Sequence, residues 1–309
     1  MRTIEVSGKY SGKRVDRILW DSFPHMPSGA LFKAFRKKDV KVNGLRVKED
    51  HIAVEGDRID VYIVDEILLG TPRDSDFRLN SGFSVVYEDN SLLIVNKEQG
   101  IPVHPDREQS DNTLIDRVQA YLEQKGEYDP SNPSHFPPSL CHRLDRNTGG
   151  LLIIAKNSES LKLLLEKIKS KEIRKYYLCL VQGQMPKTRD ELKAYLEKDE
   201  KKSRVYIHPE PSRNSQEIIT RYRVLSAEGE TSRLEVELVT GRTHQIRAHL
   251  AYMGHPIVGD GKYGSNSFNR SMKSKYQALW AYKLVFDFKT GAGPLNYLKG
   301  KKFQVEPGF

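Results

Sequence analysis

The sequence predicts a mixed α+β fold, in which a domain with a mainly antiparallel sheet follows a small unit of two helices and short strands. Runs rich in β-branched and aromatic residues outnumber helical runs, and the two kinds do not alternate regularly along the 309 residues. The chain also lacks a GKS or GKT phosphate loop. These observations argue against a doubly wound nucleotide-binding sheet and favour a mixed sheet with a central cleft.

Residues 12–64 are expected to form most of the small N-terminal unit. Apolar residues recur at helical spacing in its first predicted helix, at Val15, Ile18, Leu19 and Phe23. Ser28 can cap a second short helix, which carries Leu31, Phe32 and Phe35. Residues 40–42 then alternate, Asn43-Gly44 is a strong hairpin-turn signal, and residues 57–63 alternate again.

The same unit has an uneven charge between residues 30 and 48. Only Asp39 is acidic there, whereas seven residues are basic: Lys33, Arg36, Lys37, Lys38, Lys41, Arg46 and Lys48. A charge run by itself is usually a solvated helix face. However, a helix pair, a basic turn, a VxVNG hairpin and a later GDRI strand resemble the small RNA-binding module first described in a ribosomal protein of the small subunit. The resemblance implies that Lys37, Lys38 and Lys41 bind RNA.

Residues 65–81 contain Pro, Gly and mixed charge with little periodicity, which is typical of a linker. The predicted domains are therefore residues 1–64 and 82–309. Strands are predicted in the second domain at 83–87, 92–96, 151–155, 177–181, 234–238 and 280–286. Helices are predicted at 113–124 and 158–168, with Asn112 and either Asn157 or Ser158 available as caps.

The composition is typical of a globular protein, with 38% hydrophobic and 29% charged residues. The formal net charge is 50 − 41 = +9, and this excess favours a polyanionic partner such as RNA, DNA or an anionic membrane face. Cys141 and Cys179 lack the spacing of a zinc site or a redox pair, so buried free thiols in a reducing compartment are expected. The N-terminus has no signal-peptide core and no apolar run is long enough to cross a bilayer. We therefore expect a cytoplasmic protein without a membrane anchor.

The segment CHRLDRNTGGLLIIAKN, residues 141–157, places Asp145 between two arginines and beside an apolar strand. A partly desolvated carboxylate in such a place needs a cationic partner, although a single Asp is more often part of a structural salt bridge. The segment does not match a kinase catalytic loop, because Leu144 separates Arg143 from Asp145. His142 and Asp145 alone do not make a metal site, and no metal is expected.

Two further segments contain polar residues beside predicted strands. LVTGRTHQIRAHLAYMGHPIVGDGKYG, residues 238–264, brings two Arg, two His and a Gln together where a strand meets a helix, and Arg242 can point into a cleft there. Such a cluster suits phosphates and bases. In RKYYLCLVQG, residues 174–183, Tyr177 can stack on a base, although from the residues alone core packing is favoured.

These segments together resemble the RluA family of pseudouridine synthases. HRLDRNTGGLLIIAK is similar to the family motif H-R-L-D-x-x-T-S-G-x-x-x-x-A-K, and TGRTHQIRAH, KYYLCLVQG and YEDNSLLIVNKEQGIPVHP match its other segments, over residues 83–287. Two departures are visible. Gly149 stands where the family usually has Ser, and Trp280 stands where members often have His. Gly149 is expected to loosen the loop that carries Asp145.

The resemblance implies isomerisation of a uridine in RNA, in which the N-glycosidic bond breaks, the uracil turns and a C-glycosidic bond forms. It assigns Asp145 as the catalytic aspartate, Arg242 as its cationic partner, and Tyr177 as a residue that stacks on the uracil and assists the final proton removal. Arg143 is expected to fill the space of the flipped-out base, and the other predicted substrate contacts are His142, Thr148 and Arg247. Asp145 can attack the ribose, attack the base, or drive a glycal route.

The resemblance implies no cofactor. The expected partner is RNA, with large-subunit ribosomal RNA favoured and transfer RNA as the alternative, and the expected state is a monomer. Two rival hypotheses remain. A non-catalytic RNA-binding or ribosome-assembly protein predicts a damaged motif, yet Asp145, Tyr177 and Arg242 are present. A glycosidase generally needs a second carboxylate or an activated water, and no companion acid is evident near the motifs.

Overall fold

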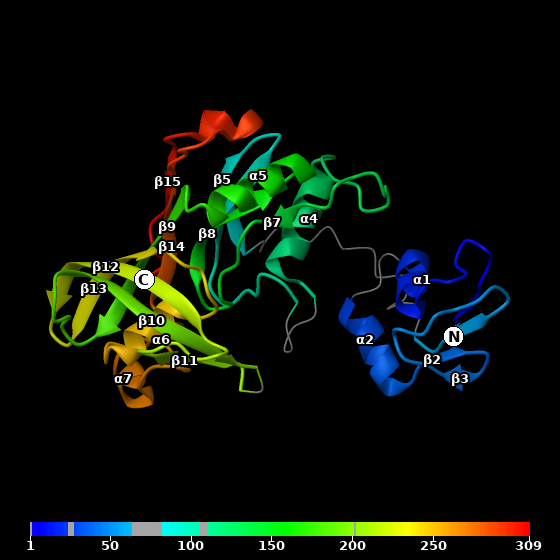
Figure 1. Cartoon of the computed structure of the whole chain (residues 1–309), viewed down its shortest axis with the longest axis horizontal. Helices are drawn as coiled ribbons and strands as arrows, with labels where there is room; N and C mark the ends of the chain where they lie inside the picture. The colour runs from blue at the N-terminus through cyan, green and yellow to red at the C-terminus, as the bar shows by residue number, and fades with distance from the viewer. Residues whose placement is uncertain (1, 24–27, 64–81, 106–110, 201) are drawn as a thin grey trace.

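The protein forms two mainly antiparallel sheets (Figure 1). The structure is a computed structural model, and it describes residues 2–23, 28–63, 82–105, 111–200 and 202–309. The first sheet has four strands and the second has eleven. The linker predicted at 65–81 lies outside the described residues, as do the side chains of Ser28, Phe32 and Lys33. No helix in the described ranges is long and apolar enough to cross a membrane.

The N-terminal unit begins with a strand that was not predicted from the sequence. Strand β1 pairs antiparallel with β4, and the sheet order is β1-β4-β2-β3. The elements are β1 (Arg2–Glu5), α1 (Val15–Ser22), α2 (Ser28–Lys37), β2 (Val40–Val42), β3 (Leu45–Arg46) and β4 (Arg58–Val61). Asn43 and Gly44 have positive φ angles of 51° and 78°, so the predicted hairpin turn is confirmed. The apolar face of α1 is buried against the sheet, also as predicted.

The large sheet has the order β11-β10-β12-β13-β9-β14-β8-β6-β5, with β15 added to β14 and β7 added to β8. Among the described strands, only β14 and β8 pair in parallel, so the mainly antiparallel prediction is confirmed. The strands are β5 (Phe83–Glu88), β6 (Leu92–Lys97), β7 (Ser139–Leu140), β8 (Gly149–Ala155), β9 (Ile173–Gln182), β10 (Arg189–Asp199), β11 (Arg204–His208), β12 (Gln216–Glu228), β13 (Thr231–Leu238), β14 (Leu279–Phe286) and β15 (Lys302–Gln304).

Helices cover both faces of β8. Leu152 and Ile154 face a core that includes α4, whereas Leu151 and Ile153 face a second core that includes α5 and η2, as the two-residue period of a strand requires. The helices are α4 (Leu114–Gln124), α5 (Ser158–Lys169), α6 (Gln245–Tyr252), α7 (Asn266–Ser271) and the 3₁₀ helix η2 (Gly293–Leu298). In Figure 1, α4 and α5 lie near β5 and β8, while α6 and α7 lie near β10 and β11.

The helix caps agree with the sequence in one case of two. The N-cap of α5 is Asn157, whose side chain accepts a hydrogen bond from the backbone N–H of Ser160. The N-cap of α4 is Thr113 and not Asn112. Thr113 forms a capping box with Asp116, which satisfies two backbone donors at once.

Gly149 and Trp280 lie opposite each other in the parallel pair of β8 and β14. A Cβ atom at position 149 would lie 2.3 Å from the ring of Trp280, which is far inside van der Waals contact. The indole therefore fills the space that a serine side chain would occupy. A looser Asp145 loop stays a prediction, although the buried ring of Trp280 fills the space beside Gly149 that a larger side chain would occupy.

Candidate active site

A cavity of about 640 Å³ brings together side chains from the three polar segments singled out in the sequence. Asp145 and Arg143 come from the loop between β7 and β8, Tyr177 comes from β9, and Arg242 and His244 come from the turn before α6. The segments singled out in the sequence therefore meet at one cavity, although the sequence did not predict how their side chains pair.

The loop that carries Asp145 is anchored by a lysine at the end of β6. The side chain of Lys97 is fully buried, and its Nζ donates hydrogen bonds to the carbonyl oxygens of Glu98, Ile101 and Arg146 at 2.7, 2.9 and 3.0 Å. Burial lowers the pKa of Lys97 to about 7, against the raising effect of the Asp145 charge. Sequence reasoning missed this residue, and the available signal was a lysine that directly ends the apolar run LLIVN.

Two glutamines hold the other side of the same loop. Gln99 Nε2 donates to the carbonyl oxygens of Asn147 and Gln277 at 2.9 and 2.8 Å. Gln277 Nε2 in turn donates to the hydroxyl of Thr148 at 2.8 Å. Thr148 is buried, so its hydroxyl anchors the loop in this structure, and a direct contact of Thr148 with substrate stays a prediction.

The cation that pairs with Asp145 is Arg247. Arg247 Nη1 donates to Asp145 Oδ2 at 2.7 Å, and its Nε and Nη2 donate to the two oxygens of Asp260 at 2.7 and 3.0 Å. The guanidinium thus bridges two carboxylates, a geometry that lysine cannot supply. Both carboxylates raise the pKa of Arg247, against the effect of its burial.

Arg242, which the family resemblance placed in this role, has an exposed side chain and lines the cavity. Its backbone N–H donates to Gln245 Oε1 at 3.1 Å, which places it in the turn that precedes α6. Arg247 lies further along, within α6, where the helix faces Asp145. In this structure Arg247, and not Arg242, therefore pairs with Asp145, while contacts of Arg242 and Arg247 with substrate stay predictions.

His244 is the second polar group beside Asp145, with Nε2 4.0 Å from Oδ2. The hydroxyl of Tyr263 accepts the backbone N–H of Val205 at 3.0 Å and lies 2.9 Å from His244 Nδ1. Burial lowers the pKa of His244 to about 4, so the ring is neutral near pH 7.

His244 also has a left-handed backbone, with φ of 54° and ψ of 16°. That conformation is uncommon for a residue with a side chain, and it occurs preferentially at functional sites. His244 belongs to the polar cluster noted in the sequence, but no role for it followed from the sequence. The other histidine of that cluster, His249, is buried and lies 3.0 Å from the hydroxyl of Thr220, outside the cavity lining.

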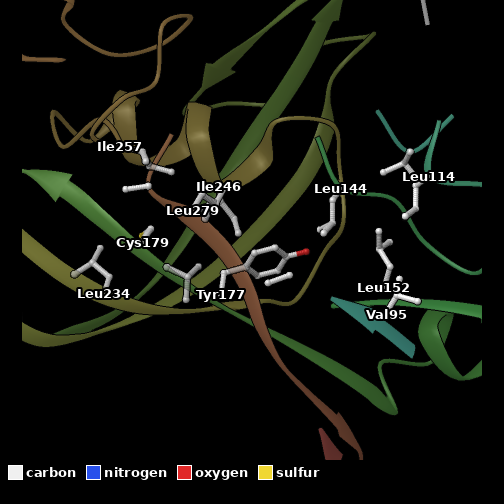
Figure 2. Packing of buried hydrophobic residues seen from close by; sticks show 14 of the residues in the cluster. Val95, Leu114, Leu144, Leu152, Tyr177, Cys179, Leu234, Ile246, Ile257 and Leu279 are labelled. Atoms are coloured by element: carbon white, nitrogen blue, oxygen red, sulfur yellow. The ribbon is translucent and has the colours of Figure 1, made fainter. Parts of the chain in front are cut away.

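Tyr177 lies in the largest apolar core, with its ring among Ile246, Leu279 and Leu144 (Figure 2). The side chain is only 4% exposed, yet it also lines the cavity. Burial and the charge of Asp145 raise the pKa of its hydroxyl, so the phenol stays protonated near neutral pH. Tyr177 therefore packs in the core and also borders the cavity, so the two interpretations do not exclude each other.

The remaining predicted residues divide into two groups. Arg143 is exposed at the cavity, and His142 lines it, with Nε2 accepting the backbone N–H of Ile153 at 3.3 Å. Lys37 and Lys38 are exposed in the N-terminal unit. Lys41 is half-buried, and its Nζ lies 4.8 Å from the ring centre of Tyr62. Across the described ranges, no group of three or more His, Cys, Asp or Glu side chains could hold a metal ion.

Comparison with known proteins shows the class of protein. A family model described as RNA pseudouridylate synthase matches residues 91–252. Human RNA pseudouridylate synthase domain containing 4 has a similar structure, with a TM-score of 0.56 and 20% identity over 72% of this chain and 88% of that one. This likeness shows the same fold. The Asp145 motif lies within the matched region, as do Tyr177, Arg242 and Arg247.

The curated relatives make the assignment more specific. Ribosomal large subunit pseudouridine synthase C of Vibrio cholerae is 32% identical over 86% of this chain and 81% of its own length. Ribosomal large subunit pseudouridine synthase D of Borreliella burgdorferi is 31% identical over 92% of this chain and 85% of its own length. The chain belongs to the RluA family of RNA pseudouridine synthases, and it is an isomerase.

Proposed function

We propose that this enzyme converts uridines of large-subunit ribosomal RNA to pseudouridine, with Asp145 as the catalytic group. One observation carries the assignment of Asp145. Its Oδ2 is held by Arg247, its Oδ1 has no hydrogen bond within the described part of the chain, and the side chain borders the cavity. The carboxylate is therefore fixed through one oxygen and available to a ligand through the other. The choice of ribosomal RNA rests on the printed names of the relatives.

The reaction requires an ionised carboxylate. Attack on the ribose, attack on the base and removal of a sugar proton all begin from the anion, and the Arg247 guanidinium stabilises that anion. The bond between N1 and C1′ breaks, a bond between C5 and C1′ forms, C5 loses its proton and N1 gains one. Oxidation state does not change, so the balance needs no redox cofactor.

The position of Tyr177 suits a nucleobase. A uridine in a helix cannot reach the cavity, so the nucleotide must turn out of its stack, which costs a few kcal/mol. Tyr177 borders the cavity, where it would contact the base, and the exposed guanidinium of Arg143 at the cavity can occupy the vacated place in the RNA. The exposed lysines of the N-terminal unit would neutralise phosphates outside the cavity.

The site also bears on the assembly and the compartment. We expect a monomer as the active form. Cys141 and Cys179 are both free and buried, which supports the reducing environment of the cytoplasm.

The test is pseudouridine mapping of ribosomal and transfer RNA in cells that lack this gene. Sites that disappear should return with the wild-type gene and not with Asp145→Asn, which keeps the size of the side chain and removes its charge. If the affected sites lie in large-subunit ribosomal RNA, the whole proposal is supported. If they lie in transfer RNA, the catalytic assignment holds and transfer RNA is the substrate. If no site changes, or if Asp145→Asn restores them all, the catalytic assignment is wrong.

A further inference from the structure

A second part of the cavity contains a lysine with no role in the mechanism above. Lys175 lies on β9 two residues before Tyr177, so both side chains lie on the same face of the strand. Both also line the cavity that contains Asp145. Two residues along a strand span roughly 6 to 7 Å, which is comparable with the size of a nucleotide. A ligand on Tyr177 is therefore within reach of Lys175.

Lys175 is half-buried, and it differs from the fully buried Lys97 and Lys167 because it has no partner among the described residues. In the described part of the chain it makes no hydrogen bond and no ion pair, and burial alone lowers its pKa. Lys97 has three carbonyl oxygens, and Lys167 has Glu172 at 3.0 Å and Thr290. A partly desolvated ammonium without a partner is energetically unfavourable, and an anionic ligand that enters the cavity would supply that partner.

The neighbouring histidine is also a donor without an acceptor. His142 Nε2 accepts the backbone N–H of Ile153, so the proton of the neutral ring is on Nδ1. His142 Nδ1 is buried and has no hydrogen-bond partner among the described residues. Lys175 lies close enough for its charge to lower the pKa of His142 further, after the larger effect of burial. Two adjacent donors with no acceptor favour an acceptor-rich ligand.

The charge of the whole cavity points in the same direction. Among the described residues, its lining contains a single carboxylate, Asp145, which is already paired with Arg247. Lys175, Arg143 and Arg242 line the same space. A Cβ atom at Gly241 would lie only 3.5 Å from Lys175 Nζ, so the turn before α6 passes directly beside the ammonium. The described lining is therefore positive in total, and no described group neutralises the charge of Lys175.

We infer that Lys175 binds a backbone phosphate of the RNA directly next to the nucleotide held on Tyr177 and Asp145. This inference rests on the proposed function, because it places the target uridine in the cavity. Among the acceptors of RNA, a phosphate alone supplies the negative charge that the ammonium lacks. The contact would position the flipped-out nucleotide, so Lys175 is a binding residue and takes no part in bond breaking.

The experiment measures the affinity for a stem-loop RNA carrying the mapped uridine, as a function of salt concentration. Lys175→Met should weaken binding about tenfold, as expected for loss of one charged hydrogen bond. It should also reduce the slope of log affinity against log salt by roughly 0.7 to 0.9, the value for one phosphate contact. Lys175→Arg should keep the slope. Lys299→Met, an equal charge change at an exposed lysine outside the cavity lining, is the matched control for net charge.

Replacement of single phosphates identifies the contact. The same RNA is made with one uncharged methylphosphonate on the 5′ or the 3′ side of the uridine. One of the two should weaken binding to the wild type and have no further effect on Lys175→Met, whose fold is checked by circular dichroism. The inference would be overturned if Lys175→Met kept the salt slope of the wild type. It would also be overturned if, at both phosphates, the methylphosphonate weakened binding to Lys175→Met as much as it weakened binding to the wild type. If the wild type forms no pseudouridine in this RNA, the proposed function fails first, and the inference fails with it.

Discussion

Replacement of Arg247 by methionine should destabilise the large domain, whereas the same change at Arg242 should not. Arg247 is 8% exposed and holds Asp260, which is fully buried, and Asp145, which is 24% exposed. Removal of one partner from a buried pair costs about 3 to 5 kcal/mol, because the remaining charge is left uncompensated. Arg242 is exposed, and a surface change of this kind stays within about 0.5 kcal/mol. The difference is a large part of a typical total stability.

The assay is urea unfolding followed by tryptophan fluorescence. The chain has two tryptophans, so a Trp20→Phe background leaves Trp280 as the only reporter, and Trp280 belongs to the large sheet. Adding Asp260→Asn to Arg247→Met should recover part of the loss, since an amide needs no counter-charge. Equal midpoints for Arg247→Met and its parent, or an equal loss for Arg242→Met, would refute the pairing of Arg247 with the two carboxylates.

Two further predictions follow from the packing and from the buried histidines. Gly149→Ser should destabilise the protein by about 1 to 3 kcal/mol through overpacking against Trp280, and the pair Gly149→Ser with Trp280→His should recover most of that loss in thermal unfolding. Burial lowers the pKa of both His244 and His249 to about 4. Between pH 6.5 and 4, therefore, only the unfolded chain binds protons at these two histidines. The free energy of unfolding should fall as the pH falls through this range, by roughly 3 kcal/mol for each histidine. Urea midpoints measured from pH 7 to 4 check the direction, and His249→Gln should flatten the curve; a midpoint that rises on acidification contradicts the assignment.

The local parts of the fold were predictable from the sequence, and the long-range pairings were not. The Asn43-Gly44 hairpin and the α5 cap follow from contacts within a few residues, and the structure contains both. Strands β10 to β12 were missed because their outward positions are charged and their apolar positions are widely spaced. Such strands are defined by their neighbours in the sheet, which lie far away in the sequence.

The same holds for the candidate site, where residue types could be predicted from local segments and contacts between distant segments could not. Asp145 and Tyr177 were predicted as site residues from the family resemblance, but the cationic partner of Asp145 lies 102 residues away. The choice between Arg242 and Arg247 depends on where α6 begins and which side it turns to the loop. Lys97 and Gln277 reach the loop from two other segments, and no local pattern shows that they meet there.

The contact of Gly149 with Trp280 has a consequence for how the sequence could have changed over time. Gly149 and Trp280, the two departures from the usual family residues, lie opposite each other across β8 and β14, so the residue allowed at one position depends on the other. In a lineage that started from Ser and His, a tryptophan that arrived first would have met the serine side chain at an impossible distance. A glycine that arrived first would have left only a small void, which a protein tolerates more easily. Sterics therefore favour an order in which the smaller residue comes before the larger one.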